Sequence, residues 1–324
     1  MAVLLDAPRW EAHGTTWAHL VSDSSLAELH AFAERAGVPR RAFDLDHYDV
    51  PAERHAELVA LGAEPVSARE MVVRLAASGL RVTARDRARA RHADLAARWD
   101  ALVPGAEDVG AELLRRWSEP HRTYHGTAHL AACLRSVQVA AEGLGPVPRT
   151  VLLALWFHDA VHDGEAGRDE ERSAALAREL LGPLVVDGAR AGGAADDDGA
   201  GGAADDEGAA DVGALTGADV DEVARLVALT THHDPGPDDV AGALVSDADL
   251  AVLAGSDRAY RRYVRQVRAE YAHVDDDAWR VGRGQVLRAL LGAERLFATP
   301  SGRERWEARA RANVAAELAA LDAP

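Results

Sequence analysis

The sequence contains no lysine, and all 36 of its basic residues are arginine. Without lysine the chain cannot form a Schiff base with a substrate or cofactor. It also cannot build a P-loop, whose lysine contacts the nucleotide phosphates. Any contact with phosphate must therefore come from arginine, histidine, backbone N–H groups or a metal ion.

Cysteine and long apolar runs are also scarce. The single cysteine, Cys133, excludes an internal disulfide and favours a reducing, cytoplasmic setting. Cys133 lies in an apolar stretch with helical spacing, so we expect it to fill the core rather than to react. The N-terminal MAVLLDAPRW lacks the features of a signal peptide, and no stretch of about 20 apolar residues could span a membrane.

Positive charge is in deficit, and the formal net charge is −17. This excess of acid argues against nucleic acid or an anionic membrane as the partner. Eight acids and one arginine within 187–211 account for −7 of the total, and they lie in a Gly/Ala/Asp-rich insert at 187–218. The insert repeats GGAADDDGA as GGAADDEGA and has almost no large apolar side chain. We therefore expect it to be disordered.

The 324 residues are enough for two domains. Residues 1–85 predict a small α/β domain. It would have an apolar strand at its start and helices over 24–36, 51–61 and 67–77, the last beginning with the capping box of Ser67 and Glu70. The arginine- and alanine-rich segment 83–100 predicts a connecting helix, which puts the domain boundary near 85–90.

The rest of the chain, 90–324, predicts an all-α domain that carries the 187–218 insert. Apolar residues recur at i, i+3 and i+4, and no alternating strand pattern occurs in this half. The pattern predicts helices over 109–118, 127–142, 149–161, 169–181, 219–230, 257–272 and 303–321.

The predicted helical domain also contains the residues best suited to chemistry. His125 and His129 are four apart and share one face if their segment is helical. His158 and Asp159 are adjacent at the end of an apolar run, and SDADL follows at 246–250. Imidazole nitrogen and carboxylate oxygen suit a catalytic divalent metal, because they hold it and leave positions open for water and substrate.

These motifs resemble the HD-domain superfamily of metal-dependent phosphohydrolases, and most closely its bacterial predicted HD phosphohydrolases. The resemblance covers about 92–300 apart from the insert, and it rests on EPHRTYHGTAH, LWFHDAVHD, DEERSA, LTTHH, DADLAVLAG, RAEY and GR. It implies an all-α HD bundle that hydrolyses a phosphate ester, such as a nucleotide, with metal-activated water.

The resemblance also implies roles for individual residues. His125 matches the histidine that protonates the leaving oxygen, and Asp247 competes with Asp249 for the last metal position. The expected ligands are His129, His158, Asp159 and Asp249. The cofactor would be one divalent ion or two, drawn from Mn²⁺, Mg²⁺, Zn²⁺, Co²⁺, Ni²⁺ and Fe²⁺.

An outer ring of residues bears on the number of metals and on the substrate. Glu170 stands where many two-metal HD proteins have a ligating histidine, and this departure favours a single ion. His232 and His233 face the substrate phosphate, complete a second site or simply end a helix, whereas His162 is more readily a surface residue. Candidates to clamp phosphate, or alternatively to form ordinary ion pairs, are Arg122, Arg268 and Arg283.

Two other functions stay open. One is oxygenase chemistry on a two-iron HD site, which requires additional histidines. The other is a non-catalytic module that binds a nucleotide and regulates. In each reading the partner is a small molecule, phosphorylated for the hydrolase, and neither nucleic acid nor membrane is expected. A homo-oligomer is compatible with all of them.

The first 85 residues resemble a short bacterial domain of unknown function. The resemblance rests on LLDAPRW, HGTTWAHLVSDSSLAELHAFA, GVPRRAFDLDHYDV and GAEPVSARE. The polar residues His13, His19, Asp23, His47 and Asp49 either form a second metal or ligand site or serve as capping and surface groups. Trp10, Trp17 and Tyr48 would then be core residues.

Overall fold

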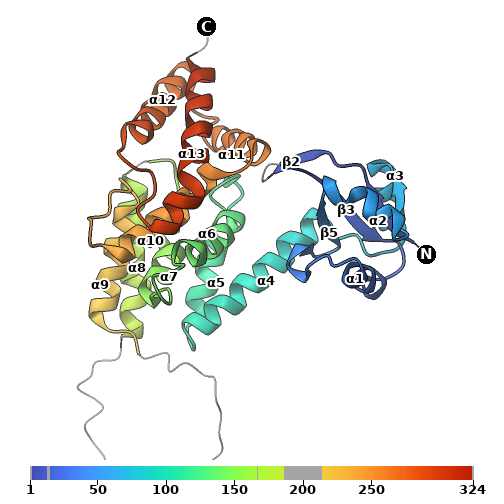
Figure 1. Ribbon diagram of the computed structural model, residues 1–324. Helices are drawn as coiled ribbons and strands as arrows, with labels where there is room; N and C mark the ends of the chain where they lie inside the picture. Colours follow the sequence, from blue (N-terminus) through green and yellow to red (C-terminus); the bar gives the residue numbers. More distant parts are fainter. Residues whose placement is uncertain (1, 13–14, 166, 186–213, 323–324) are drawn as a thin grey trace, which may run out of the picture. The chain divides into compact units, whose positions relative to one another are not determined.

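The computed structural model describes residues 2–12, 15–165, 167–185 and 214–322 (Figure 1). The chain divides into two compact units. The N-terminal unit comprises Met1–Arg91 with Gly255–Arg262, and the helical unit comprises His92–Ala254 with Tyr263–Pro324. The chain passes from one to the other within α4 (Ala84–Leu102), where a connecting helix is predicted.

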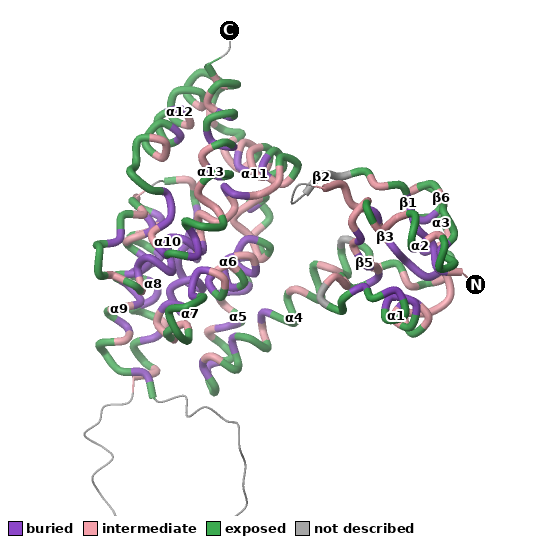
Figure 2. Tube along the Cα trace, in the orientation of Figure 1, coloured by how far each residue is buried: buried purple, intermediate pink, exposed green. Residues whose placement is uncertain are grey.

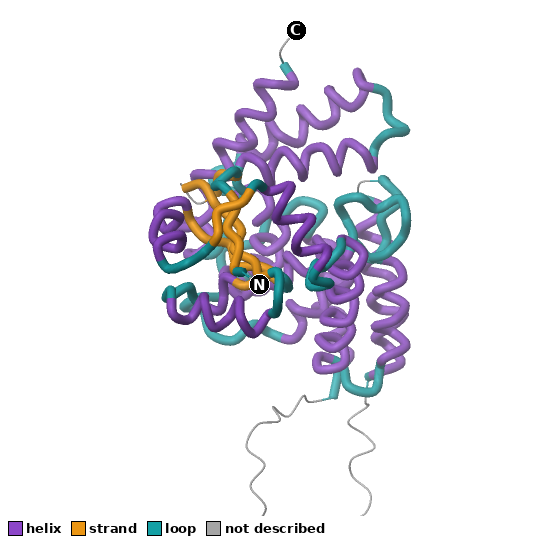
Figure 3. Tube along the Cα trace, turned by 90° about the vertical axis from the view of Figure 1, so that its right-hand side faces the viewer, coloured by secondary structure: helices purple, strands orange, loops and turns teal. Residues whose placement is uncertain are grey.

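The N-terminal unit is built on one mixed sheet with strand order β4-β5-β3-β1-β6, and β2 pairs with β3 (Figure 3). Only β1 and β6 run parallel; the other pairs are antiparallel. The strands are β1 (Val3–Asp6), β2 (Trp10–Ala12), β3 (Thr15–Ser22), β4 (Phe43–Asp44), β5 (His47–Pro51) and β6 (Glu64–Val66). Of these strands, the residue pattern predicts only the first.

Helices cover both faces of this sheet. Successive residues of a strand point to opposite faces, so neighbouring apolar residues pack against different helices. Leu5 and Leu20 pack with α1 (Leu26–Arg35) and α2 (His55–Ala60), whereas Leu4 and Val21 pack with α3 (Ala68–Ala77). The Ser67 side chain accepts a hydrogen bond from the Glu70 N–H at the start of α3, at the predicted cap. Short 3₁₀ turns occupy Arg40–Ala42 and Ala52–Arg54, and the second delays the start of α2.

The helical unit packs around one apolar core whose largest members are Trp99, Trp117, Trp156 and Phe157 (Figure 2). After α4 its helices are α5 (Glu107–Arg116), α6 (Thr127–Ala140), α7 (Arg149–Phe157), α8 (Arg168–Leu181), α9 (Gly217–Leu229), α10 (Val240–Leu250), α11 (Asp257–Glu270), α12 (Asp276–Gly292) and α13 (Pro300–Leu321). Helix α11 begins in the residues assigned to the N-terminal unit. Two 3₁₀ turns lie at Gly182–Leu184 and Ala251–Ala254.

Several predicted boundaries are wrong. Helices α10 and α12 were not predicted, and α7 ends at Phe157 rather than at 161. The first residues of the insert, 187–213, lie outside the described residues, but its last five are ordered. Leu215 is buried in the core and Thr216 caps α9. None of the described helices is both long and apolar enough to cross a membrane.

Candidate metal centre

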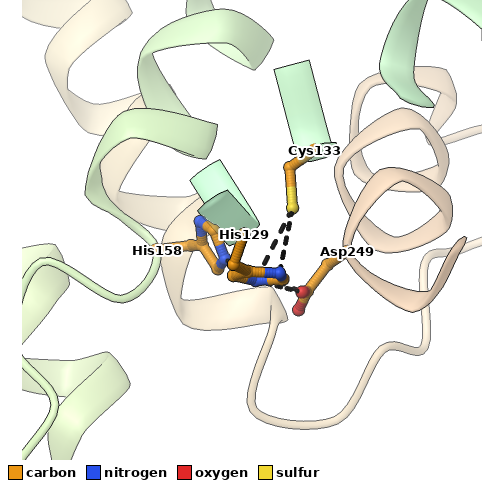
Figure 4. A group of neighbouring side chains, drawn as sticks. All are labelled: His129, Cys133, His158 and Asp249. Atoms are coloured by element: carbon orange, nitrogen blue, oxygen red, sulfur yellow. Dashed lines mark hydrogen bonds and ion pairs between the residues drawn. The ribbon is translucent and has the colours of Figure 1, made fainter. Parts of the chain in front are cut away.

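Three helices of the helical unit bring the predicted metal ligands together in a candidate metal centre, of which Figure 4 shows His129, His158 and Asp249 beside Cys133. His129 lies in the first turn of α6, and Asp249 lies in the last turn of α10. His158 is the C-cap of α7, where its N–H still donates to the Ala154 carbonyl, and Asp159 follows it. Because α6 packs against both α7 and α10, the four side chains converge.

The ligand atoms are spaced as around a shared ion. The Nε2 atoms of His129 and His158 are 3.1 Å apart, and Asp249 Oδ1 lies 3.0 Å and 3.7 Å from them. Asp159 Oδ2 lies 3.2 Å from His158 Nε2 and 3.6 Å from His129 Nε2. Ligands about 2.1 Å from one ion lie roughly 3.0 Å apart at octahedral angles and roughly 3.4 Å apart at tetrahedral angles. The observed distances span these values.

A hydrogen bond orients the His158 ring toward this centre. Its Nδ1 lies 2.8 Å from the carbonyl oxygen of Leu155, one turn back in α7. That carbonyl can only accept, so Nδ1 carries a proton and Nε2 faces the centre, where it can ligate a metal once it is deprotonated. Histidines that bind metals in proteins are held in the same way.

The electrostatics of the centre favour positive charge there. Burial opposes charge on His158, yet the carboxylates of Asp159 and Asp249 raise its pKa well above the ordinary value. Burial works against the charged carboxylates too, but His158 and His129 lower the pKa of Asp249 well below its ordinary value. A buried pair of carboxylates needs positive charge nearby, and a divalent ion supplies more of it than a proton does.

Cys133 was predicted to be only a core residue, and it is buried there. Its Sγ, however, lies 3.6 Å from Nε2 of His129, one turn earlier in α6, and close enough to His158 and Asp249 to count as a fourth donor of the group. The spacing of four from His129 was the signal for this neighbour. Burial raises the pKa of the thiol well above its ordinary value, which favours packing over ligation.

The structure separates the two competing aspartates. Asp247 is fully buried but points away from the histidines, toward the start of α13. Its carboxylate accepts hydrogen bonds from the N–H groups of Ala298 and Thr299 and from the Thr299 hydroxyl, at 2.7, 2.9 and 2.7 Å. Asp247 therefore secures a helix start, whereas Asp249 lies with the predicted ligands.

His125 lies beside the centre, but not for the predicted reason. Helix α6 begins at Thr127, so His125 precedes it and shares no helical face with His129. Its Nδ1 lies 2.6 Å from Glu270 Oε2, and Glu270 Oε1 accepts the N–H groups of Tyr124 and His125. Burial lowers the pKa of His125, although Asp159 and Glu270 act in the opposite direction.

Glu270 is a functional candidate that the sequence did not reveal, and His162 was expected more readily on the surface. Glu270 is 145 residues from His125, and no local spacing links the two. His162 is buried rather than on the surface, with its ring centroid 4.0 Å from that of His125 and its Nε2 3.6 Å from Glu270 Oε2. His125, His162 and Glu270 form a second group that could hold a metal.

Tyr124 adds a polar group whose bonding is incomplete. Its ring packs on His125 and His129, with centroid distances of 4.7 and 4.8 Å. Within the described residues its buried hydroxyl has no hydrogen-bond partner. Buried hydroxyls are normally satisfied, so this one is suited to bond a water or ligand at the centre.

The three arginines predicted to clamp phosphate are engaged elsewhere. The Arg122 guanidinium is buried and donates to the carbonyls of His125, Asp159 and Ala160 and to Glu119, which ties His125 to the His158-Asp159 segment. Arg268 donates to the carbonyls of Tyr271 and Val274 and to Asp276. Arg283 is paired with Glu317 inside the helical unit. None of the three faces the centre with open donors.

The predicted outer ring is also incomplete. Glu170 Oε2 accepts the Gly167 N–H in the capping box of α8, so it does not join the ligands. His232 is exposed after the end of α9. His233 does reach the centre, with its Nε2 3.4 Å from Asp249 Oδ2 and its backbone at a φ of 51°.

A cavity of about 270 Å³ adjoins the second histidine group. Glu270 and His162 belong both to the cavity and to the group. The lining residues are His121, His162, Asp163, Gly164, Glu270, Tyr271 and His273. A small molecule placed there would lie beside His162 and Glu270, which both contact His125.

Comparison with known proteins identifies only the N-terminal part of the chain. No curated protein and no solved structure matches the chain. Residues 3–78 match the family described as protein of unknown function (DUF4031), in agreement with the predicted resemblance of the first 85 residues to a domain without assigned activity.

Proposed function

We propose that the helical unit hydrolyses a phosphate ester with water activated by a divalent metal ion. The observation that carries the proposal is the convergence of His129, His158, Asp159 and Asp249 at the mutual distances of ligands sharing one ion. The resemblance of the surrounding motifs to HD-domain phosphohydrolases supports the same reaction.

The donor set fits a transition metal. Two imidazole nitrogens and two carboxylate oxygens suit Zn²⁺, Mn²⁺, Fe²⁺, Co²⁺ or Ni²⁺ better than Mg²⁺, which keeps most of its water shell. When bound, such an ion lowers the pKa of its water from 15.7 toward about 7 and neutralises charge on the phosphoryl oxygens. The Leu155 carbonyl holds the His158 ring in the orientation that binding requires.

His125 and Glu270 are the pair that handles the proton. The Glu270 carboxylate fixes Nδ1 of His125 and leaves Nε2 to exchange a proton with the reacting group. Burial lowers the pKa of His125, so its protonated form is a stronger acid toward a leaving oxygen. Proton transfer of this kind contributes roughly 10²–10⁴-fold to a rate.

The substrate phosphate would be held by the metal and by histidines rather than by arginine. The nearby cavity is lined by His121, His162 and His273, and its volume of about 270 Å³ suits a small phosphorylated molecule. The three arginines expected to bind phosphate already pair with protein groups, so the proposal gives them no part in substrate binding; they are Arg122, Arg268 and Arg283.

The test is phosphate release from a panel of phosphate esters, nucleotides included, after the metal-free chain is reloaded with Mn²⁺, Mg²⁺, Co²⁺, Ni²⁺ or Zn²⁺. We expect activity with at least one ester, loss of activity with a chelator, and loss in His158→Ala. His92→Ala, at an exposed histidine of α4, is the matched control and should behave like the wild type. Activity that persists in chelator and in His158→Ala would refute the proposal.

One observation favours a second function. His125 and His162 supply the additional histidines that a two-iron oxygenase requires, and Glu270 adds a carboxylate beside them. If the helical unit held two irons, consumed oxygen and released no phosphate, its function would be that of an oxygenase and not of a hydrolase.

A further inference from the structure

A third group of potential ligands lies on the sheet of the N-terminal unit. His47 and Asp49 are two residues apart in β5, so their side chains leave the same face. His19 in β3 is the direct cross-strand partner of Asp49 in the antiparallel register. Pairing of β3 with β5 therefore brings two imidazoles and one carboxylate to a single place.

The donor atoms of these residues are close enough to share an ion. One ligand atom from each of His19, His47 and Asp49 lies within 4.8 Å of the others. His47 Nε2 is 3.2 Å from Asp49 Oδ1, and the two imidazole centroids are 4.9 Å apart.

Each histidine is held by a buried carboxylate through its Nδ1. His19 Nδ1 lies 3.0 Å from Asp6 Oδ2, and His47 Nδ1 lies 2.8 Å from Asp46 Oδ1. The side chains of Asp6 and Asp46 are only 3% and 4% exposed, and each is also fixed by a backbone N–H, from His19 and Val82 respectively. Carboxylates in this position orient metal-binding histidines and strengthen them as ligands.

Asp49 contributes an oxygen that the described residues leave without a hydrogen bond. Its Oδ1 is buried although the side chain as a whole is 40% exposed. Its ion-pair partner is His47 Nε2 at 3.2 Å, and a cation placed between Asp49 and the two rings would compensate the buried charge in place of that pair.

A cavity of about 310 Å³ gives access to this group. His19 and His47 form part of its wall, and Asp46, Arg81 and Arg87 lie on it as well. Three protein donors leave at least one coordination position for water or a small ligand, which is the arrangement of reactive rather than purely structural sites.

We propose that His19, His47 and Asp49 bind a divalent transition-metal ion of the Zn²⁺ type in the N-terminal unit. Asp6 and Asp46 are the positioning residues that orient the two imidazoles. This site shares no residue with the centre of the helical unit, so it stands or falls independently of the proposed hydrolysis.

The test uses the full chain and Zn²⁺ alone, with bound metal counted after equilibrium dialysis. We expect His19→Ala and His47→Ala each to bind about one zinc fewer per chain than the wild type, while His158→Ala keeps this ion. Asp6→Asn should retain it with an affinity about 10–100-fold lower. His92→Ala, with its exposed histidine, should bind as the wild type does. Equal zinc content in the wild type, His19→Ala and His47→Ala would overturn the proposal.

A measurement on the wild type covers the case in which a variant fails to fold. Zn²⁺ should shift the ring-nitrogen resonances of His19 and His47 in a histidine NMR spectrum, whereas those of His30, which bonds Tyr48 instead, should stay in place. Unshifted His19 and His47 resonances at saturating zinc would overturn the proposal as well.

Discussion

Replacing Asp247 and Asp249 one at a time distinguishes the residue that supports a helix start from the candidate metal ligand. Asp247→Ala removes a buried carboxylate that accepts three hydrogen bonds at the start of α13. The Thr299 hydroxyl, one of the three donors, itself caps α13 by accepting the Gly302 N–H at 2.9 Å. The substitution therefore loosens a helix cap and leaves two buried N–H groups without acceptors.

The expected cost follows from these contacts. A hydrogen bond to a charged group contributes about 1.5–3 kcal/mol, and the three here are partly offset by the burial that raises the pKa of Asp247. We expect a net loss of about 3–4 kcal/mol, or a fall in Tm of roughly 6–16 °C for a unit of this size. Metal should still bind, because Asp247 touches none of the ligand atoms.

Asp249→Ala should show the opposite pattern. Its carboxylate faces His129, His158 and His233, so the variant should lose bound metal. The α13 cap is untouched, so the metal-free variant should lose only the stability that the buried pairing of Asp249 with His129 and His158 contributes. Thermal unfolding by circular dichroism and metal analysis of the same samples measure both effects. Metal loss in Asp247→Ala with retention in Asp249→Ala would refute the assignment.

Five other changes should give distinct results. Gly110→Ala would place a methyl group 2.6 and 2.7 Å from Cγ and Nε1 of Trp99, so we expect it to lower the free energy of unfolding by about 1–3 kcal/mol in denaturant titrations. The control Gly282→Ala, whose methyl group would have nothing within 4 Å, should not destabilise the protein. Equal stability of the two variants would contradict the packing. His125→Ala should lower kcat about 10²–10⁴-fold with metal content unchanged, and Glu270→Gln should shift the pH profile of kcat; an unshifted profile would remove Glu270 from the mechanism. Cys133→Ala should keep its metal, because burial holds the thiol neutral, and metal loss would make the sulfur a ligand. Val185 and Leu215 form a β-bridge, so replacing 187–213 by a short glycine linker should leave Tm unchanged, and a large loss would show that the insert contributes to the fold.

Local sequence patterns predicted much of the helical unit and its centre. The 3.6-residue periodicity indicated most of its helices, and His158 next to Asp159 drew attention because an ionisable pair after an apolar run is costly without compensation. The structure places these two residues with His129 and Asp249. Helix α10 escaped prediction because it is apolar almost all round and therefore shows little periodicity.

What the sequence could not predict depends on contacts between distant residues. Glu270 contacts His125 although the two are 145 positions apart, and Arg122 donates hydrogen bonds to carbonyls nearly 40 positions away. The strands of the N-terminal unit were missed because both faces of the sheet are covered by helices, so apolar residues such as Leu20 and Val21 are adjacent rather than alternating. Cross-strand pairing, invisible in the sequence, is also what brings His19 opposite Asp49.

The central claim is that the helical unit holds a divalent metal at His129, His158, Asp159 and Asp249. The most direct measurement is a crystal structure of the Mn²⁺- or Zn²⁺-loaded chain with an anomalous difference map at the metal edge. The account predicts a peak within about 2.0–2.3 Å of the Nε2 atoms of both histidines, with carboxylate oxygens of both aspartates also bound and water in a remaining position. A fully loaded crystal with no anomalous peak between these four side chains would contradict it.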